Sequence, residues 1–174
     1  MKYFIMEKDH DCLKSPEIVN WFDTINKKDI NRESFHEIPK RTILNIKSNE
    51  DTIYTDIITR PFLLLSPLVY EISEKYESII PSKQVILLDK EKGGASLYHL
   101  PILEKIDCIA KESELNSDKS KFINPVLLYE KIKNKNIFWA KGFESVSPIV
   151  SLDFVESILR RGAVGIYLTE IKLK

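Results

Sequence analysis

The chain has few glycines and few cysteines, five and two among its 174 residues. A loop that cradles a phosphate needs glycines at a set spacing, and neither Gly93-Gly94 nor the pair Gly162 and Gly165 has that spacing. No serine stands in a Gly-x-Ser-x-Gly turn, the setting of many hydrolase nucleophiles. Nucleotide binding and serine hydrolysis are therefore not indicated.

Long hydrophobic runs are also missing. The longest, residues 61–65, falls well short of the roughly 18 residues that span a bilayer. The N-terminus becomes charged within seven residues, too early for the apolar part of a secretory signal. We therefore expect a cytoplasmic protein without a membrane partner, in which Cys12 and Cys108, 96 positions apart, stay unpaired rather than forming a disulfide.

Neither sign of charge is in excess, because 26 basic residues balance 26 acidic ones. Nucleic-acid-binding proteins usually carry a basic excess, so no nucleic-acid partner is expected. The hydrophobic content of 43% is enough for one core, and a single domain over residues 1–174 is the simplest organisation. The many isoleucines, 24 in all, favour strands.

The C-terminal residues 147–173 predict a short strand, a helix and a closing strand. Ser151 is placed to cap the helix, and Asp153 lies in the first turn, where the helix dipole favours a negative charge. Arg160 and Arg161 stand at the opposite end, directly before a Gly162 stop. These local signals agree with one another, so we expect an ordered unit.

A second helix is predicted to begin at Pro67, with Ser66 as its cap, and to end before Pro81. Its apolar face would carry Leu68, Val69, Ile72, Tyr76 and Ile79. Both predicted helices have a glutamate five residues after the capping serine and run into a strand, so two strand-helix-strand units could face one sheet. Helix-start chemistry explains this similarity more simply than a duplication.

The remaining strands are predicted from β-branched and alternating runs. They are residues 2–6; 41–46 and 52–58, joined by a polar turn; 84–88, a buried strand, and 96–100, joined at Gly93-Gly94; 106–109; and 126–129 and 136–140, paired around a lysine-rich turn. Residues 7–40 are expected to be irregular with one short helix at most, and 111–121 to be a surface loop. The predicted fold is α+β, with a mostly antiparallel sheet and at least two helices.

Two groups of residues could carry chemistry. His99 and Cys108 lie on neighbouring predicted strands and could act as base and thiol nucleophile, although core or sheet-face positions suit their apolar surroundings better. Residues 9–12, Asp-His-Asp-Cys, include metal-binding types but have no second ligand pair nearby, so a polar loop is favoured. No catalytic, cofactor-binding or metal-binding residue is assigned.

Three aromatic side chains are candidates for contact with a partner. They are Trp21, Phe22 and Trp139, because aromatic residues dominate interface hot spots. Folding of Trp21 and Phe22 into the core is the favoured alternative. The lysines near Trp139 could suggest a nucleic-acid platform, but lysines that keep a hairpin turn solvated are the simpler interpretation.

Several short motifs follow one another in residues 61–174. They are Leu64-Leu65-Ser66-Pro67-Leu68-Val69, Val85 to Asp89 leading to Tyr98-His99-Leu100-Pro101, Ile106-Asp107-Cys108, Ile137-Phe138-Trp139, and Val150-Ser151 through Glu156 to Gly165-Ile166. Their order resembles immunity protein eleven, a family of immunity proteins of bacterial polymorphic-toxin systems. The N-terminal residues 1–60 match the family only thinly.

The resemblance implies a cytoplasmic protein that is not an enzyme and that binds and neutralises a cognate toxin. It assigns no functional residue, because these motifs mark the fold and not a site. Two alternatives remain open. One is a small thiol or hydrolase-type enzyme that uses Cys108 and His99, and the other is a structural or regulatory homo-oligomer built on exposed sheet edges.

Overall fold

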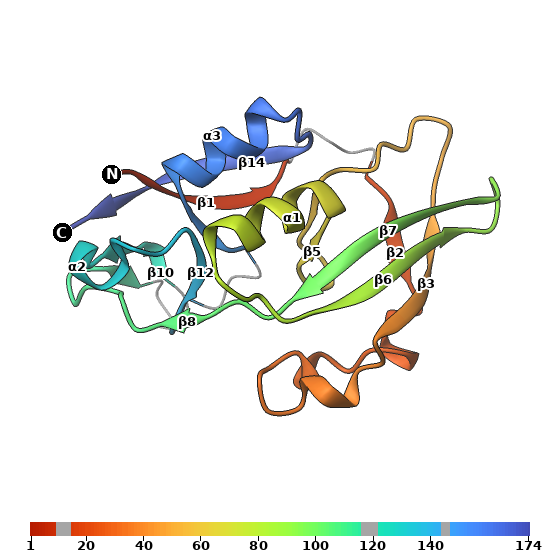
Figure 1. Cartoon of the computed structure of the whole chain (residues 1–174), viewed down its shortest axis with the longest axis horizontal. Coiled ribbons are helices and arrows are strands. Elements are labelled where there is room, and N and C mark those ends of the chain that lie inside the picture. The colour runs from red at the N-terminus through yellow and green to blue at the C-terminus, as the bar shows by residue number, and fades with distance from the viewer. Residues whose placement is uncertain (10–14, 116–121, 144–146) are drawn as a thin grey trace.

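Two six-stranded sheets with helices between them form the computed structural model, which describes residues 1–9, 15–115, 122–143 and 147–174 (Figure 1). The first sheet has the order β11(Val126–Leu127), β14(Ile166–Leu173), β1(Tyr3–Lys8), β13(Ile149–Ser151), β12(Ile137–Ala140), β8(Lys105–Ile106). The second has the order β2(Glu17–Val19), β3(Arg41–Lys47), β6(Ser82–Asp89), β7(Gly94–Pro101), β5(Leu64–Leu65), β4(Ile57–Ile58). A separate short pair joins β9(Glu114–Leu115) to β10(Phe122–Asn124).

The predicted α+β class with mostly antiparallel pairing is confirmed. Among the described residues, eight strand pairs are antiparallel and three are parallel. The α-helices are α1(Pro67–Tyr76), α2(Tyr129–Ile132) and α3(Leu152–Arg160). The hairpin of β6 and β7 is paired over its whole length, from Ser82 opposite Pro101 to Asp89 opposite Gly94.

Both predicted helix starts are confirmed. The Ser66 hydroxyl accepts a hydrogen bond from the Val69 N–H at 3.3 Å, and Ser151 does the same for the Phe154 N–H at the same distance. These bonds satisfy donors that the first turn of a helix leaves without partners. The first helix ends earlier than its apolar pattern suggested, and Ile79 lies beyond it with its side chain 83% exposed.

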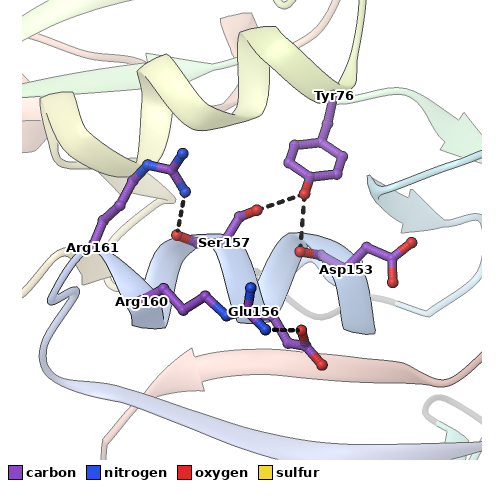
Figure 2. Close-up of polar contacts among 6 residues, drawn as sticks. All are labelled: Tyr76, Asp153, Glu156, Ser157, Arg160 and Arg161. Atoms are coloured by element: carbon purple, nitrogen blue, oxygen red, sulfur yellow. Dashed lines mark hydrogen bonds and ion pairs between the residues drawn. The ribbon is translucent and has the colours of Figure 1, made fainter.

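The two helices α1 and α3 pack against each other between the sheets. Figure 2 shows the Tyr76 hydroxyl of α1 directed at α3, 3.0 Å from the Asp153 carbonyl oxygen and 2.5 Å from the Ser157 hydroxyl. At the C-terminal end of α3, Arg161 donates to the Ser157 carbonyl at 2.9 Å. Apolar residues from both helices and both sheets surround this contact and form the central cluster, which includes Met6, Leu65, Val69, Ile72, Val150, Phe154 and Ile158.

Each sheet buries its other face under irregular chain. Residues 20–40 place Ile25, Phe35 and Ile38 against Leu44 and Val85 of the second sheet. Residues 17–37 hold β2 and three short 3-10 helices, Trp21–Asp23, Lys27–Asp29 and Phe35–Glu37, so the expectation of irregular structure with one short helix at most for residues 7–40 understated the local order. The first sheet is covered by another cluster, made of Tyr3, Cys108, Leu127, Ile132, Phe138 and Ile149.

The two predicted strand-helix-strand units lie in different sheets, not against one. In β5–α1–β6 the two strands are separated by β7, and in β13–α3–β14 they are separated by β1. Because each intervening strand is antiparallel to both neighbours, the outer strands of each unit run parallel to one another. The units therefore share one topology and meet through their helices.

Several predicted strand pairs are wrong. β3 pairs with β2 and, in parallel, with β6, whereas only Ile57–Ile58 of the next predicted strand is extended, and it pairs with β5. Likewise β11 pairs with β14, and β12 pairs with β13 and β8, while α2 occupies the stretch between them. The predicted strand 106–109 is reduced to β8 and one isolated bridge. For β3 and β11 the better partner is a longer strand from a distant part of the chain, β6 and β14 respectively.

Asp56 connects the two units. Its carboxylate accepts from the Ser66 hydroxyl at 2.5 Å and from the Val164 N–H at 2.7 Å, and its own N–H donates to the Val164 carbonyl at 3.0 Å. The next residue, Gly165, has a φ of +72° and lies directly against buried Thr55. A Cβ at Gly165 would be 2.5 Å from the Thr55 Cβ and closer still to its Cγ2.

Replacing Gly165 by alanine should destabilise the protein more than replacing Gly162. Both glycines have positive φ, which costs an alanine about 1 kcal/mol, but only the Gly165 position also forces two side chains together. We expect a loss of about 1 kcal/mol for Gly162→Ala and about 3 kcal/mol for Gly165→Ala in chemical denaturation. Equal losses for the two variants would contradict the tight contact with Thr55.

Candidate functional site

Cys108 is a free thiol that is fully buried between α2 and the first sheet. Burial raises the pKa of the Cys108 thiol to about 11, and the neighbouring Asp107 carboxylate adds to this effect. A thiol is nucleophilic as its thiolate, so this environment suppresses the reactivity that a thiol enzyme needs.

His99 lies in the other sheet, on β7. Its ring stacks on the Tyr70 ring of α1, with centroids 4.1 Å apart and an interplanar angle of 3°, and its Nδ1 is 3.4 Å from the Ser82 hydroxyl. Burial lowers the pKa of the His99 imidazole, which favours its neutral form. The structure thus places His99 in the second sheet and Cys108 in the loop that follows β8, each with its own packing partners.

The two neighbouring aromatic candidates have different surroundings. Trp21 is half-buried, edge-on to Phe62 at a centroid distance of 6.0 Å, with the Lys27 ammonium 4.6 Å above its ring. Phe22 is 64% exposed and touches Trp21 only edge-on. The favoured alternative, in which the ring packs into the core, therefore applies to Trp21 but not to Phe22.

The metal-capable run at residues 9–12 falls mostly outside the described residues. Within the part of the chain that the structure describes, no three His, Cys, Asp or Glu side chains are grouped closely enough to hold a metal ion. In that same part, no helix has the length and apolar character needed to cross a bilayer.

An apolar row crosses the face of the second sheet on which α1 packs, beside the part that the helix covers. Ile43 of β3 is opposite Ile86 of β6, which is opposite Leu97 of β7, so the three side chains project from one face. Ile43 is 58% and Leu97 38% exposed, and Ile86 is half-buried. The next register row is Asn45, Leu88 and Ala95, so the apolar surface extends over half-buried Leu88 and exposed Ala95 and ends at polar Asn45 on β3. We call Ile43, Ile86 and Leu97 the outer row.

Helix α1 covers only one end of this face. The adjacent register row is Arg41, Gln84 and His99. Tyr70 of α1 covers the His99 end of this row by stacking on the His99 ring. The Arg41 guanidinium donates to the neutral Gln84 side-chain oxygen at 2.8 and 2.9 Å, and no ion pair of Arg41 is formed within the described residues. At the other end of β3, Lys47 is exposed opposite exposed Glu17.

A hollow of about 460 Å³ opens where the link between β7 and β8 meets residues 30–33. Trp139 is half-buried in its wall, and its indole Nε1 is buried without an acceptor among the described residues. Trp139 is opposite Lys105 in the parallel pair of β12 with β8, so these two side chains leave the sheet on the same side. The other lining residues are Ile30, Asn31, Arg32, Glu33, Ile102, Leu103 and Glu104.

Comparison with known proteins identifies no family model or curated protein significantly similar to the chain. The site must therefore be argued from the geometry of the chain itself.

The outer row was missed from the sequence, although a signal was present. Residues 84–88 were expected to form a buried strand, but only Val85 and Leu87 are buried, while Ile86 and Leu88 are half-buried. A strand that is apolar on both faces indicates either complete burial or an uncovered apolar face, and only the position of α1 distinguishes the two.

The Cys108 thiol should be nearly inert in the folded protein. With a pKa of about 11, about one thiol in a thousand is ionised at pH 8, and the sulfur is also shielded from reagents. In a Cys12→Ser variant, a chromogenic disulfide reagent should react with Cys108 at least a hundredfold more slowly than after unfolding in guanidinium. A fast reaction in the native state would support the alternative that the protein is a thiol enzyme.

Proposed function

We propose that this protein is a non-enzymatic immunity protein that binds a cognate toxin of a bacterial polymorphic-toxin system and blocks it by occupying part of its surface. The observation that carries the proposal is the outer row, Ile43, Ile86 and Leu97. Contiguous apolar surface left uncovered on a folded domain commonly marks a site of protein association. The motif order of residues 61–174 supports an immunity protein as the kind of binder.

The surroundings of the row suggest what the partner carries. Arg41 and Lys47 stand on the same face of β3 as Ile43, and among the described residues the Arg41 guanidinium bonds to a neutral amide and to no carboxylate. A partner surface with an apolar centre and acidic residues at its edge would complement this face, with apolar contact supplying affinity and opposite charge supplying orientation. Glu17 beside Lys47 weakens the positive character at that end, so Arg41 is the expected charged contact.

The chemistry of the two candidate catalytic residues favours binding over catalysis. Cys108 is buried with a raised pKa, and His99 is held between Tyr70 and Ser82 in the other sheet. A thiol enzyme needs an accessible thiolate within reach of its base. This pair offers neither property.

Replacing outer-row residues by glutamate should weaken toxin binding. We expect Ile43→Glu and Leu97→Glu each to reduce affinity for the toxin domain encoded beside the gene at least tenfold, because a carboxylate would be buried against an apolar and acidic surface. Both side chains are exposed, so the free energy of unfolding should change by less than about 1 kcal/mol. Calorimetric titration and protection of cells from the toxin measure the binding, and chemical denaturation measures the free energy of unfolding.

A matched control is Ile79→Glu, which alters an even more exposed isoleucine outside the outer row. It should bind and protect like the wild type. If the wild type formed no complex with that toxin domain and gave no protection, the immunity proposal would be wrong. If both outer-row variants bound as tightly as the wild type, the toxin would contact a different surface.

The outer row also suits a second candidate function, self-association. A homo-oligomer would bury the row against a second copy, and the glutamate variants would then lower the mass of the purified protein in sedimentation without any toxin present. A monomeric wild-type protein at micromolar concentration would exclude this candidate.

A further inference from the structure

We infer that the hollow beside Trp139 is a binding site for a small carboxylate with an apolar chain, a function separate from the proposed toxin binding. Its volume of about 460 Å³ lies within the usual range of small-molecule sites. It opens at the link between the two sheets, and such junctions are a common place for ligand sites.

The charged side chains of the hollow favour an anion. Arg32 and Lys105 are both exposed and form no hydrogen bond or ion pair within the described residues. Of the two acids, Glu104 is already neutralised by Lys135, whose ammonium is 2.7 Å from its carboxylate. Glu33 is the remaining negative charge, so the hollow keeps one positive charge in excess. Because guanidinium and ammonium groups are donors only, a carboxylate is the complementary group.

The apolar lining of the hollow favours a ligand that has a hydrocarbon chain. Half-buried Ile30 and the Trp139 ring supply an apolar wall of the hollow, whereas Ile102 and Leu103 also line it but are each only 3% exposed. A bare inorganic anion would leave this wall without contact. The Trp139 indole N–H has no acceptor among the described residues, and because the residue lines the hollow, the ring can report on a bound ligand.

Both sides of the hollow are held in place by hydrogen bonds to backbone groups. On one side, the Asn31 side chain accepts from the N–H groups of Glu33 and Ser34, at 2.8 and 3.0 Å, and donates to the Lys28 carbonyl at 2.5 Å. On the other side, the Trp139 N–H donates to the Glu104 carbonyl at 2.8 Å in the pairing of β12 with β8. A site that exists before the ligand arrives loses less entropy on binding.

The test uses the full chain and hexanoate as the probe. The chain has two tryptophans, so its two indole N–H resonances can be followed by NMR and assigned with a Trp21→Phe variant. We expect hexanoate to shift the Trp139 indole resonance saturably, with a Kd of about 1 mM, the range open to a ligand of eight heavy atoms. Hexanol and hexylammonium, which lack the negative charge, should bind at least fivefold more weakly.

Three substitutions complete the test. Arg32→Gln and Lys105→Gln should each weaken hexanoate binding about fivefold, and higher salt should weaken the wild type too. Lys75→Gln, which removes an exposed charge from α1, should change nothing. The inference would be overturned by the absence of a saturable shift up to 20 mM (about twenty times the expected Kd), by equal binding of hexanol, or by unchanged binding in both hollow variants. Toxin binding through the outer row is measured separately, so either proposal can fail alone.

Discussion

Asp56 joins the start of α1 to the turn after α3, and the relation between the two sheets depends on this connection. One carboxylate bonds to the capping serine of α1 and to the backbone at Val164, while Gly165 beside it has no side chain and so lets Thr55 approach. The central cluster then fills the space between the helices. Polar bonds at one end and apolar packing along the helices together hold the two similar strand-helix-strand units in one arrangement.

This arrangement determines which surfaces remain open. Because α1 pairs with α3, it covers the second sheet only as far as His99, and the outer row beyond it stays exposed. The link from β7 to β8 must cross from one sheet to the other, and the hollow forms at that crossing. The two candidate sites differ in character. The outer row is flat and apolar and suits a protein surface, whereas the hollow is concave and positively charged and suits a small anion.

Local structure could be predicted where its causes are close in sequence. The cap, first-turn charge, apolar face and glycine stop of α3 lie within about one dozen residues, and the β6–β7 hairpin has its turn signal at Gly93-Gly94. Strand partners could not be predicted in the same way. Any strand edge offers the same backbone donors and acceptors, so β3 pairs with distant β6 because burial of Leu44 and Val85 together decides the choice.

The amino-acid sequence by itself determined the α+β class, the positions of the two capped helices and the Gly93-Gly94 hairpin. Only the tertiary structure decided that there are two sheets, that Cys108 and His99 lie apart, and that Ile43, Ile86 and Leu97 form one exposed row. The reason is physical: caps, turns and periodicity act over a few residues, whereas burial and proximity depend on which distant segments pack together. The hollow shows this most clearly, because Arg32, Lys105 and Trp139 come from three separate parts of the chain.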